Sequence, residues 1–187
     1  MQTANADGQA TFRGMDEVAL STCAARLAVA AAGGGVIYLE GELGAGKTTF
    51  ARALLHAMGC AERIKSPTYS LIESYRVGDV IAHHLDLYRI ADAGELEWLG
   101  LTDLFETGAL LLIEWPERAR NALPPADLTV QFRHAGRLRD LSVVACGARG
   151  GQLLEALRGT ESSQLAAFPV TDVEKYRPCD GFSKEKP

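Results

Sequence analysis

The chain has 187 residues, of which 47% are hydrophobic and 23% are charged, a balance typical of a globular protein with one domain. Its formal net charge of −5 argues against a protein that grips nucleic acid through its own basic surface. No charged segment opens the chain as in a signal peptide, and no apolar run is long enough to cross a bilayer. We therefore expect a cytoplasmic protein without membrane contact. The cysteines form no C-x-x-C pair, which predicts free thiols at Cys23, Cys60, Cys146 and Cys179.

The first half of the chain predicts a helix, a strand and a second helix. Residues 1–10 are small and polar, and we expect them to be disordered. A helix is predicted from Asp16 until the glycines at 33–35 stop it. The β-forming residues 36–39 predict a buried strand, and the pattern at 48–58, closed by Gly59, predicts a helix.

The second half alternates strand patterns with helical ones. In chain order we predict a hairpin of 69–75 and 80–85, a helix within 94–107, a central parallel strand at 109–113, a second hairpin whose strands include 128–132 and 141–145, and a short helix at 152–157. From about residue 160 the pattern fades. We therefore predict one α/β domain over residues 11–159, with three layers around a mixed, mostly parallel sheet, followed by a flexible tail over 160–187.

The strongest motif of the chain is a glycine-rich segment between the first predicted strand and the second predicted helix. Residues 41–48 read Gly-Glu-Leu-Gly-Ala-Gly-Lys-Thr and fit G-x-x-x-x-G-K-[ST] at every position. Glycines let backbone N–H groups approach phosphate oxygens, and the following helix points its positive end at them. Lys47 is expected to reach the β- and γ-phosphates, and the Thr48 hydroxyl to ligate Mg²⁺. This motif predicts a P-loop NTPase domain that binds ATP with Mg²⁺ through Leu43, Gly44, Ala45, Gly46, Lys47, Thr48 and Thr49.

Two acids follow apolar strands and are candidates for the chemistry opposite this loop. Asp86 comes after the run that ends at Leu85, and Glu114 comes after the run that ends at Ile113. Ligands of such sheets bind at the carboxyl ends of the strands, so both acids are expected there. Glu114 follows the more purely apolar run, and we assign it to the metal site. Asp86 is assigned as the catalytic acid that orients water, although the sequence also allows the reverse.

Three further positions are weaker candidates. Thr68 lies where several triphosphatases keep a threonine that senses the γ-phosphate, but Ser-Pro-Thr is also ordinary turn chemistry. Trp115 is expected in the core or the wall of the site, and its place directly after Glu114 also allows contact with a partner. His83 and His84 are strand neighbours that point to opposite faces, so packed or hydrogen-bonded histidines are expected rather than a metal pair.

Four segments together resemble the bacterial TsaE (YjeE) family, the small ATPases of tRNA threonylcarbamoyladenosine biosynthesis. They are the loop at 41–50, Lys-Ser-Pro-Thr-Tyr at 65–69, His-Leu-Asp-Leu-Tyr-Arg at 84–89, and Leu-Ile-Glu-Trp-Pro-Glu at 112–117. The similarity extends over about residues 12–158. Leu20 departs from it, because relatives often carry threonine there, and this puts one peripheral nucleotide contact in doubt.

The resemblance implies an ATPase that joins TsaB and TsaD and supports threonylcarbamoyl transfer to adenosine 37 of ANN-decoding tRNAs. Contact with tRNA would then be indirect, through the complex. In the family the loop lysine and threonine bind phosphate and Mg²⁺, which maps to Lys47 and Thr48. Glu114 matches the further acid of the metal site and Asp86 the catalytic acid. Nucleotide contacts from an acid before the first helix and from a late arginine map to Glu17 and Arg137.

Three other classes of function use the same loop. A small-molecule kinase would pass the phosphoryl group to a metabolite, with Arg89, Arg118 and Arg120 as lid residues, although a solvated helix face also explains the last two. A nucleotide-gated scaffold would bind ATP with negligible turnover. A GTP switch would need Asn-Lys-x-Asp and Asp-x-x-Gly elements, and neither occurs in the chain.

Overall fold

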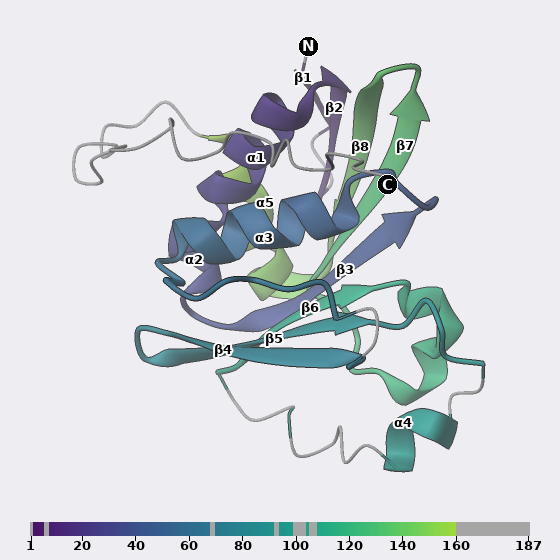
Figure 1. Ribbon diagram of the computed structural model, residues 1–187. Helices are drawn as coiled ribbons and strands as arrows, with labels where there is room; N and C mark the ends of the chain where they lie inside the picture. The colour runs from purple at the N-terminus through teal and green to yellow at the C-terminus, as the bar shows by residue number, and fades with distance from the viewer. Residues whose placement is uncertain are drawn as a thin grey trace, which may run out of the picture.

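An eight-stranded sheet in the order β1-β2-β8-β7-β3-β6-β5-β4 forms the centre of the molecule (Figure 1). The computed structural model describes residues 2–5, 8–67, 70–91, 94–98, 104 and 108–159. The strands are β1 (Gln2–Asn5), β2 (Gln9–Met15), β3 (Gly35–Gly41), β4 (Ile72–Val77), β5 (Val80–Asp86), β6 (Leu110–Glu114), β7 (Leu128–Ala135) and β8 (Leu138–Ala145). The helices are α1 (Glu17–Arg26), α2 (Ala28–Ala31), α3 (Lys47–Ala57), α4 (Gly94–Trp98) and α5 (Gly147–Arg158), with 3-10 turns η2 (Pro116–Arg118) and η3 (Arg120–Ala122).

Parallel pairing is confined to the four central strands β7, β3, β6 and β5, and the outer pairings among the described strands are antiparallel. The predicted mixed sheet is confirmed, with a smaller parallel part than we expected. In the parallel part both Leu39 and Asp86 lie in register with Glu114. Because these strands run in the same direction, their carboxyl ends meet at one edge of the sheet.

Both faces of the central strands are buried, which explains their continuous apolar sequences. Along β6, Leu110 and Leu112 belong to one hydrophobic cluster, whereas Leu111 and Ile113 belong to another. The first cluster includes side chains of α1, α2, α3 and α5, and the second includes Leu96 of α4 and Ala119 between the 3-10 turns. Figure 1 shows the four helices on one side of the sheet and α4 on the other. The predicted three-layer α/β architecture is therefore confirmed.

The N-terminal region differs from expectation. Residues 1–10 were expected to be disordered, yet Gln2–Asn5 form β1, and Gln9 and Ala10 begin β2. The two strands pair with each other, and β2 also pairs with β8. Ala10 and Phe12 alternate along β2 and are buried in the first cluster. The expectation was wrong for residues 2–5 and 9–10, because pairing with a distant strand compensates for a weakly hydrophobic sequence.

Three predicted helices differ from expectation in the structure. The one expected from Asp16 to the glycines at 33–35 is divided at Leu27 into α1 and α2. The closing helix α5 begins at Gly147, well before the predicted residue 152. Of the helix expected within 94–107, α4 covers Gly94–Trp98, and residues 99–103 and 105–107 lie outside the described residues. The predicted tail over 160–187 also lies outside them.

The remaining composition-based expectations have limited tests in the structure. No helix in the described part of the chain is long and apolar enough to span a membrane. Cys23, Cys60 and Cys146 are free thiols, and the first two are buried. Cys179 lies outside the described residues.

Candidate functional site

The loop at 41–48 joins the carboxyl end of β3 to the first turn of α3. Gly41 has a φ of 136°, and a Cβ there would lie 2.4 Å from the carbonyl oxygen of Phe132 on β7. Gly44 has a φ of 75° with open space around it. Only glycine suits the first position, where the backbones touch, and it is strongly favoured at the second. The contact between Gly41 and β7 therefore fixes the start of the loop, and the first turn of α3 fixes its end.

Lys47, the first residue of α3, lies folded against the loop. Its side chain is only 4% exposed, and Nζ donates hydrogen bonds to the carbonyl oxygens of Gly41, at 2.6 Å, and Glu42, at 2.8 Å. The ammonium also lies 3.8 Å from the ring centroid of Trp115. Burial lowers the pKa of Lys47, while the charges of Glu114, Glu117 and Asp86 oppose that change. Both acceptors that these bonds use lie on the loop, and a buried ammonium held in this way is a ready partner for an anion.

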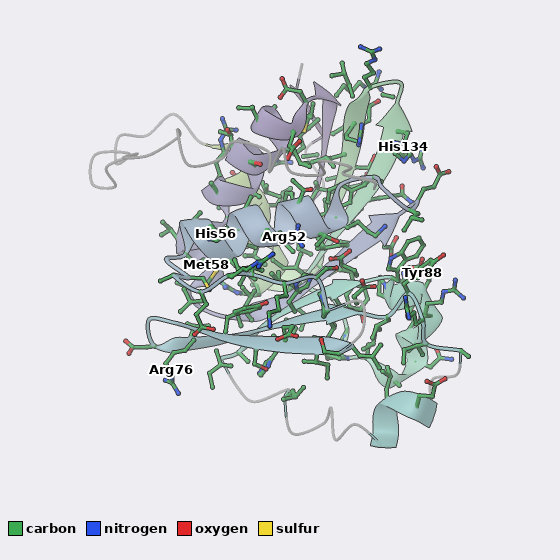
Figure 2. The ribbon with its side chains drawn as sticks, viewed as in Figure 1. Arg52, His56, Met58, Arg76, Tyr88 and His134 are labelled. Atoms are coloured by element: carbon green, nitrogen blue, oxygen red, sulfur yellow. The ribbon has the colours of Figure 1, made fainter. Side chains whose placement is uncertain are left out.

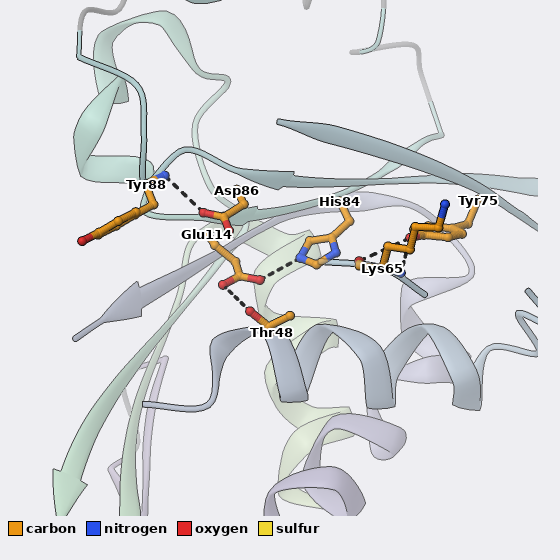
Figure 3. A network of polar contacts seen from close by, with 7 residues as sticks. All are labelled: Thr48, Lys65, Tyr75, His84, Asp86, Tyr88 and Glu114. Carbon is orange, nitrogen blue, oxygen red and sulfur yellow. Dashed lines mark hydrogen bonds and ion pairs between the residues drawn. The ribbon is translucent and has the colours of Figure 1, made fainter. Parts of the chain in front are cut away.

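Thr48, the next residue, is tied to the end of β6 (Figure 3). Its Oγ1 donates to Oε2 of Glu114 at 2.9 Å. The other oxygen of the same carboxylate, Oε1, lies 2.8 Å from Nε2 of His84 on β5. Glu114 is 2% exposed and His84 is fully buried. Glu114 therefore accepts from two side chains on two different elements, and its position is fixed by both.

Asp86 ends β5 directly beside Glu114 in the parallel register. Its Oδ1 accepts the backbone N–H of Tyr88 at 3.1 Å (Figure 3). Burial raises the pKa of Asp86; the Tyr88 hydrogen bond lowers it, Glu114 raises it, and His84 and Lys47 lower it. The two acids predicted at this edge of the sheet thus lie together, with different hydrogen-bond partners.

The donor set suits Mg²⁺ held jointly with a nucleotide. The Thr48 hydroxyl and the Glu114 carboxylate offer oxygen ligands beside the loop. Within the described residues, no group of three or more His, Cys, Asp and Glu side chains could hold a metal alone. Mg²⁺ in triphosphate sites characteristically takes one or two protein oxygens and completes its shell with phosphates and water. The residues present fit that mode of binding.

Aromatic side chains form a wall next to the loop. Trp115 has a left-handed backbone conformation, with φ 59° and ψ 46°, and its ring lies 5.0 Å from that of Tyr88. The guanidinium of Arg118 lies 5.9 Å from the Tyr88 ring. Figure 2 shows Tyr88 and His134 at the end of the sheet where β3 runs into the loop. Trp115 thus lies against Tyr88 and Lys47, and its role in the wall of the site stays a prediction.

The other predicted positions are more dispersed. In the loop and α3, Leu43 is exposed, Ala45 is buried and Thr49 is half-buried. Leu20 is buried against the loop, since a Cβ on Gly46 would lie 2.9 Å from Leu20 Cδ2. Glu17 opens α1 and Arg137 lies in the turn between β7 and β8, both exposed. Their contacts with a nucleotide stay predictions, and Thr68 lies outside the described residues.

Sequence reasoning missed three residues that contact the site. Nε2 of His134 lies 3.3 Å from the carbonyl oxygen of Leu43, and Nη2 of Arg139 donates to that of Gly44 at 3.4 Å. His84 was expected to be packed or hydrogen-bonded, but its partner, Glu114, was not foreseen. One signal was available: His84 and Asp86 are two residues apart on one strand and so share a face.

Comparison with known proteins gives consistent matches. A family model described as threonylcarbamoyl adenosine biosynthesis protein TsaE matches residues 15–141. A protein from Haemophilus influenzae called tRNA threonylcarbamoyladenosine biosynthesis protein TsaE is 40% identical over 121 residues, 65% of this chain and 77% of its own. The protein of the same name from Bacillus subtilis is 37% identical over 125 residues, 66% of this chain and 78% of its own. The crystal structure of Bacillus subtilis YdiB superposes with a TM-score of 0.68 at 29% identity, covering 83% of this chain and 97% of that one.

Proposed function

We propose, from the premise that the chain belongs to the TsaE family of tRNA threonylcarbamoyladenosine biosynthesis, that it binds ATP with Mg²⁺ and hydrolyses it. The observation that carries this proposal is the arrangement of Lys47, Thr48 and Glu114 at the point where β3 ends. A buried ammonium, a hydroxyl and a carboxylate face the same loop. Such a set neutralises phosphate charge and holds a divalent cation.

Lys47 supplies the cation that meets the β- and γ-phosphates. Its present hydrogen bonds go to Gly41 and Glu42 carbonyl oxygens, which the ammonium can exchange for phosphate oxygens as the side chain turns. The loop N–H groups and the N-terminus of α3 add partial positive charge on the same side. Charge is thus supplied by preorganised groups of the chain, which is the main contribution of a protein to phosphoryl transfer.

Thr48 and Glu114 would hold Mg²⁺, and Asp86 would orient the attacking water. Bound Mg²⁺ neutralises negative charge on the β- and γ-phosphate oxygens. Asp86 lies beside Glu114, and its Oδ1 accepts the Tyr88 N–H. A carboxylate at this position can accept a hydrogen bond from water beside the metal site. Nucleotide contacts from Glu17, Thr49, Arg137 and Thr68 are also part of this proposal.

The proposal extends to partners through the family. The relatives are named for tRNA threonylcarbamoyladenosine biosynthesis. We infer that ATP turnover by this chain supports threonylcarbamoyl transfer to adenosine 37 of ANN-decoding tRNAs by a TsaB–TsaD pair. The exposed surface beside Tyr88 and Trp115 lies next to the nucleotide site, so a partner there would be sensitive to its state.

A substitution at Lys47 tests the ATPase assignment. Lys47→Ala removes the charge that meets the phosphates, so hydrolysis should fall by at least about tenfold, or about 1.4 kcal/mol of transition-state stabilisation. Release of ADP and phosphate is measured with and without TsaB and TsaD, and the products are searched for any phosphorylated metabolite.

Arg76→Ala serves as the control, because Arg76 is an exposed cation of β4 that lies at the opposite end of the sheet from Tyr88 and His134 (Figure 2). It should retain wild-type turnover. Thermal melting checks that both variants are folded, since Lys47 is buried. Turnover of folded Lys47→Ala within about twofold of wild type would contradict the ATPase assignment. A phosphorylated metabolite in place of free phosphate would identify a kinase.

A further inference from the structure

His84 is a buried polar side chain that packing alone does not explain. It is fully buried, and one ring nitrogen, Nε2, lies 2.8 Å from Oε1 of Glu114. Its other nitrogen, Nδ1, is buried and has no hydrogen-bond partner among the described residues. Leaving a buried polar atom unpaired typically costs about 1–3 kcal/mol, which an apolar side chain of similar size would avoid. The hydrogen bond to Glu114 is therefore the feature to explain.

The carboxylate of Glu114 is held from both sides. Nε2–H of His84 donates to Oε1, because an ionised carboxylate can only accept, and Oγ1–H of Thr48 donates to Oε2 at 2.9 Å. Figure 3 shows the Glu114 carboxylate linked through one oxygen to the strand histidine and through the other to Thr48 in the first turn of α3. Two donors on opposite oxygens fix both the plane and the rotation of the carboxylate. Removing His84 would leave Glu114 tethered at one oxygen only.

We propose that His84 is a positioning residue that fixes the Glu114 carboxylate, and through it the Thr48 hydroxyl, for Mg²⁺ at the nucleotide site. This proposal rests on the proposed function. His84 would touch neither metal nor nucleotide and would act only through Glu114. Hydrogen bonds that orient a ligating carboxylate typically affect metal affinity by about 10–100-fold. The expected loss is therefore in the contribution of Mg²⁺, not in nucleotide binding as such.

The neighbouring histidine provides a matched control. His83 is also buried, but it lies on the opposite face of β5, where its Nδ1 lies 2.8 Å from Oγ of Ser74 on β4. The same substitution at the two positions therefore changes the same atoms one residue apart, on the two faces of one strand. Any effect specific to His84 comes from its face of the strand.

The variants His84→Asn, His84→Leu and His84→Gln separate positioning from packing. Asn is too short to reach Glu114, and Leu has no donor. Gln places an N–H donor near the position of the histidine Nε2. Binding of AMP-PNP, an ATP analogue that resists hydrolysis, is measured by calorimetry in EDTA and over a series of Mg²⁺ concentrations. Thermal melting is recorded for each variant.

For His84→Asn and His84→Leu, we expect the gain in AMP-PNP affinity from Mg²⁺ to fall by about tenfold or more. Affinity in EDTA should stay within about twofold of wild type, a split that a general loss of structure would not give. His84→Gln should recover most of the gain, and His83→Asn should keep all of it.

A Mg²⁺ gain within about twofold of wild type in folded His84→Asn or His84→Leu would overturn the proposal. If both variants fail to fold, or if both lose affinity equally with and without Mg²⁺, the role of His84 is structural and the proposal is overturned too. Failure of the proposed function looks different, because wild-type protein would then show no Mg²⁺-dependent binding of AMP-PNP at all.

Discussion

At the scale of single residues, two neighbouring carboxylates in one site are distinguished by what donates to them. Glu114 accepts from His84 and from Thr48, which belongs to the loop motif. Asp86 accepts the backbone N–H of Tyr88, and burial raises its pKa, with the charge of Glu114 acting in the same direction. A carboxylate bonded to the loop threonine is suited to the metal. Asp86, whose Oδ1 accepts a backbone N–H, is suited to orient a water molecule.

Exchanging each acid for its amide tests this division. Glu114→Gln should weaken the Mg²⁺ dependence of nucleotide binding, since it removes charge beside Thr48. Asp86→Asn should leave ATP affinity nearly intact and lower turnover, because an interaction made chiefly in the transition state changes kcat rather than ground-state binding. ATP is titrated at several Mg²⁺ concentrations, and turnover is measured with TsaB and TsaD present.

The two substitutions serve as controls for each other, because they remove one charge each from adjacent strand ends. Loss of metal-dependent binding in Asp86→Asn alone would mean that the two roles are exchanged. Unchanged turnover in both variants would remove both acids from the chemistry.

At the scale of elements, the sequence predicts those strands and helices whose bounds depend on neighbouring residues alone. The strand expected at 36–39 is part of β3 (Gly35–Gly41), and the helix expected at 48–58 is α3 (Lys47–Ala57). These bounds follow from local residues: apolar β-forming residues, a run of glycines and a helical pattern. No distant contact is needed to predict them. The position of both acids at one edge of the sheet was predictable for the same reason, because each ends an apolar strand.

Elements that depend on distant contacts could not be predicted in the same way. The first turn of α5 contains Gly150, which reads as a loop residue. A Cβ there would lie 2.0 Å from the carbonyl oxygen of Asp127, so close packing against the start of β7 requires glycine. The contact of His134 with the loop likewise exists only because β7 pairs with β3. The bond between His84 and Glu114 depends on the register of two strands.

Because β7 contacts the loop, we expect two glycine substitutions to lower the free energy of unfolding by different amounts. Gly41→Ala should destabilise by more than Gly44→Ala, because its Cβ would meet the Phe132 carbonyl at 2.4 Å, whereas Gly44 has open space around it. Both have positive φ, so Gly44→Ala should still cost about 1–2 kcal/mol from backbone strain. Urea unfolding measures both free energies. Equal costs would show that the backbone approach at Gly41 does not limit the fold.

At the scale of the whole molecule, the net charge is acidic but one hairpin is basic, and the two have opposite effects on the binding of a polyanion. The chain carries a formal net charge of −5. The hairpin of β7 and β8 nevertheless exposes Arg133, His134 and Arg137, and His134 contacts the loop carbonyl of Leu43. In the proposed site the nucleotide phosphates would lie at this loop, which would give the local charge a use that does not involve tRNA. Long-range attraction to a polyanion depends on the overall field, which is unfavourable here.

We therefore expect the isolated chain to bind tRNA weakly and to meet it only through partners. Fluorescence anisotropy of a labelled ANN-decoding tRNA should give a Kd weaker than about 10 μM at about 0.15 M salt, the range of non-specific electrostatic contact. A pull-down with TsaB and TsaD, with ATP and without it, should retain the chain more strongly with ATP. Labelled tRNA should then join the assembly.

Arg133→Ala serves as a control, because it removes one exposed charge of the hairpin outside the loop motif. Tight binding of tRNA by the isolated chain, weakened by salt and by Arg133→Ala, would contradict indirect contact and identify the hairpin as a tRNA surface.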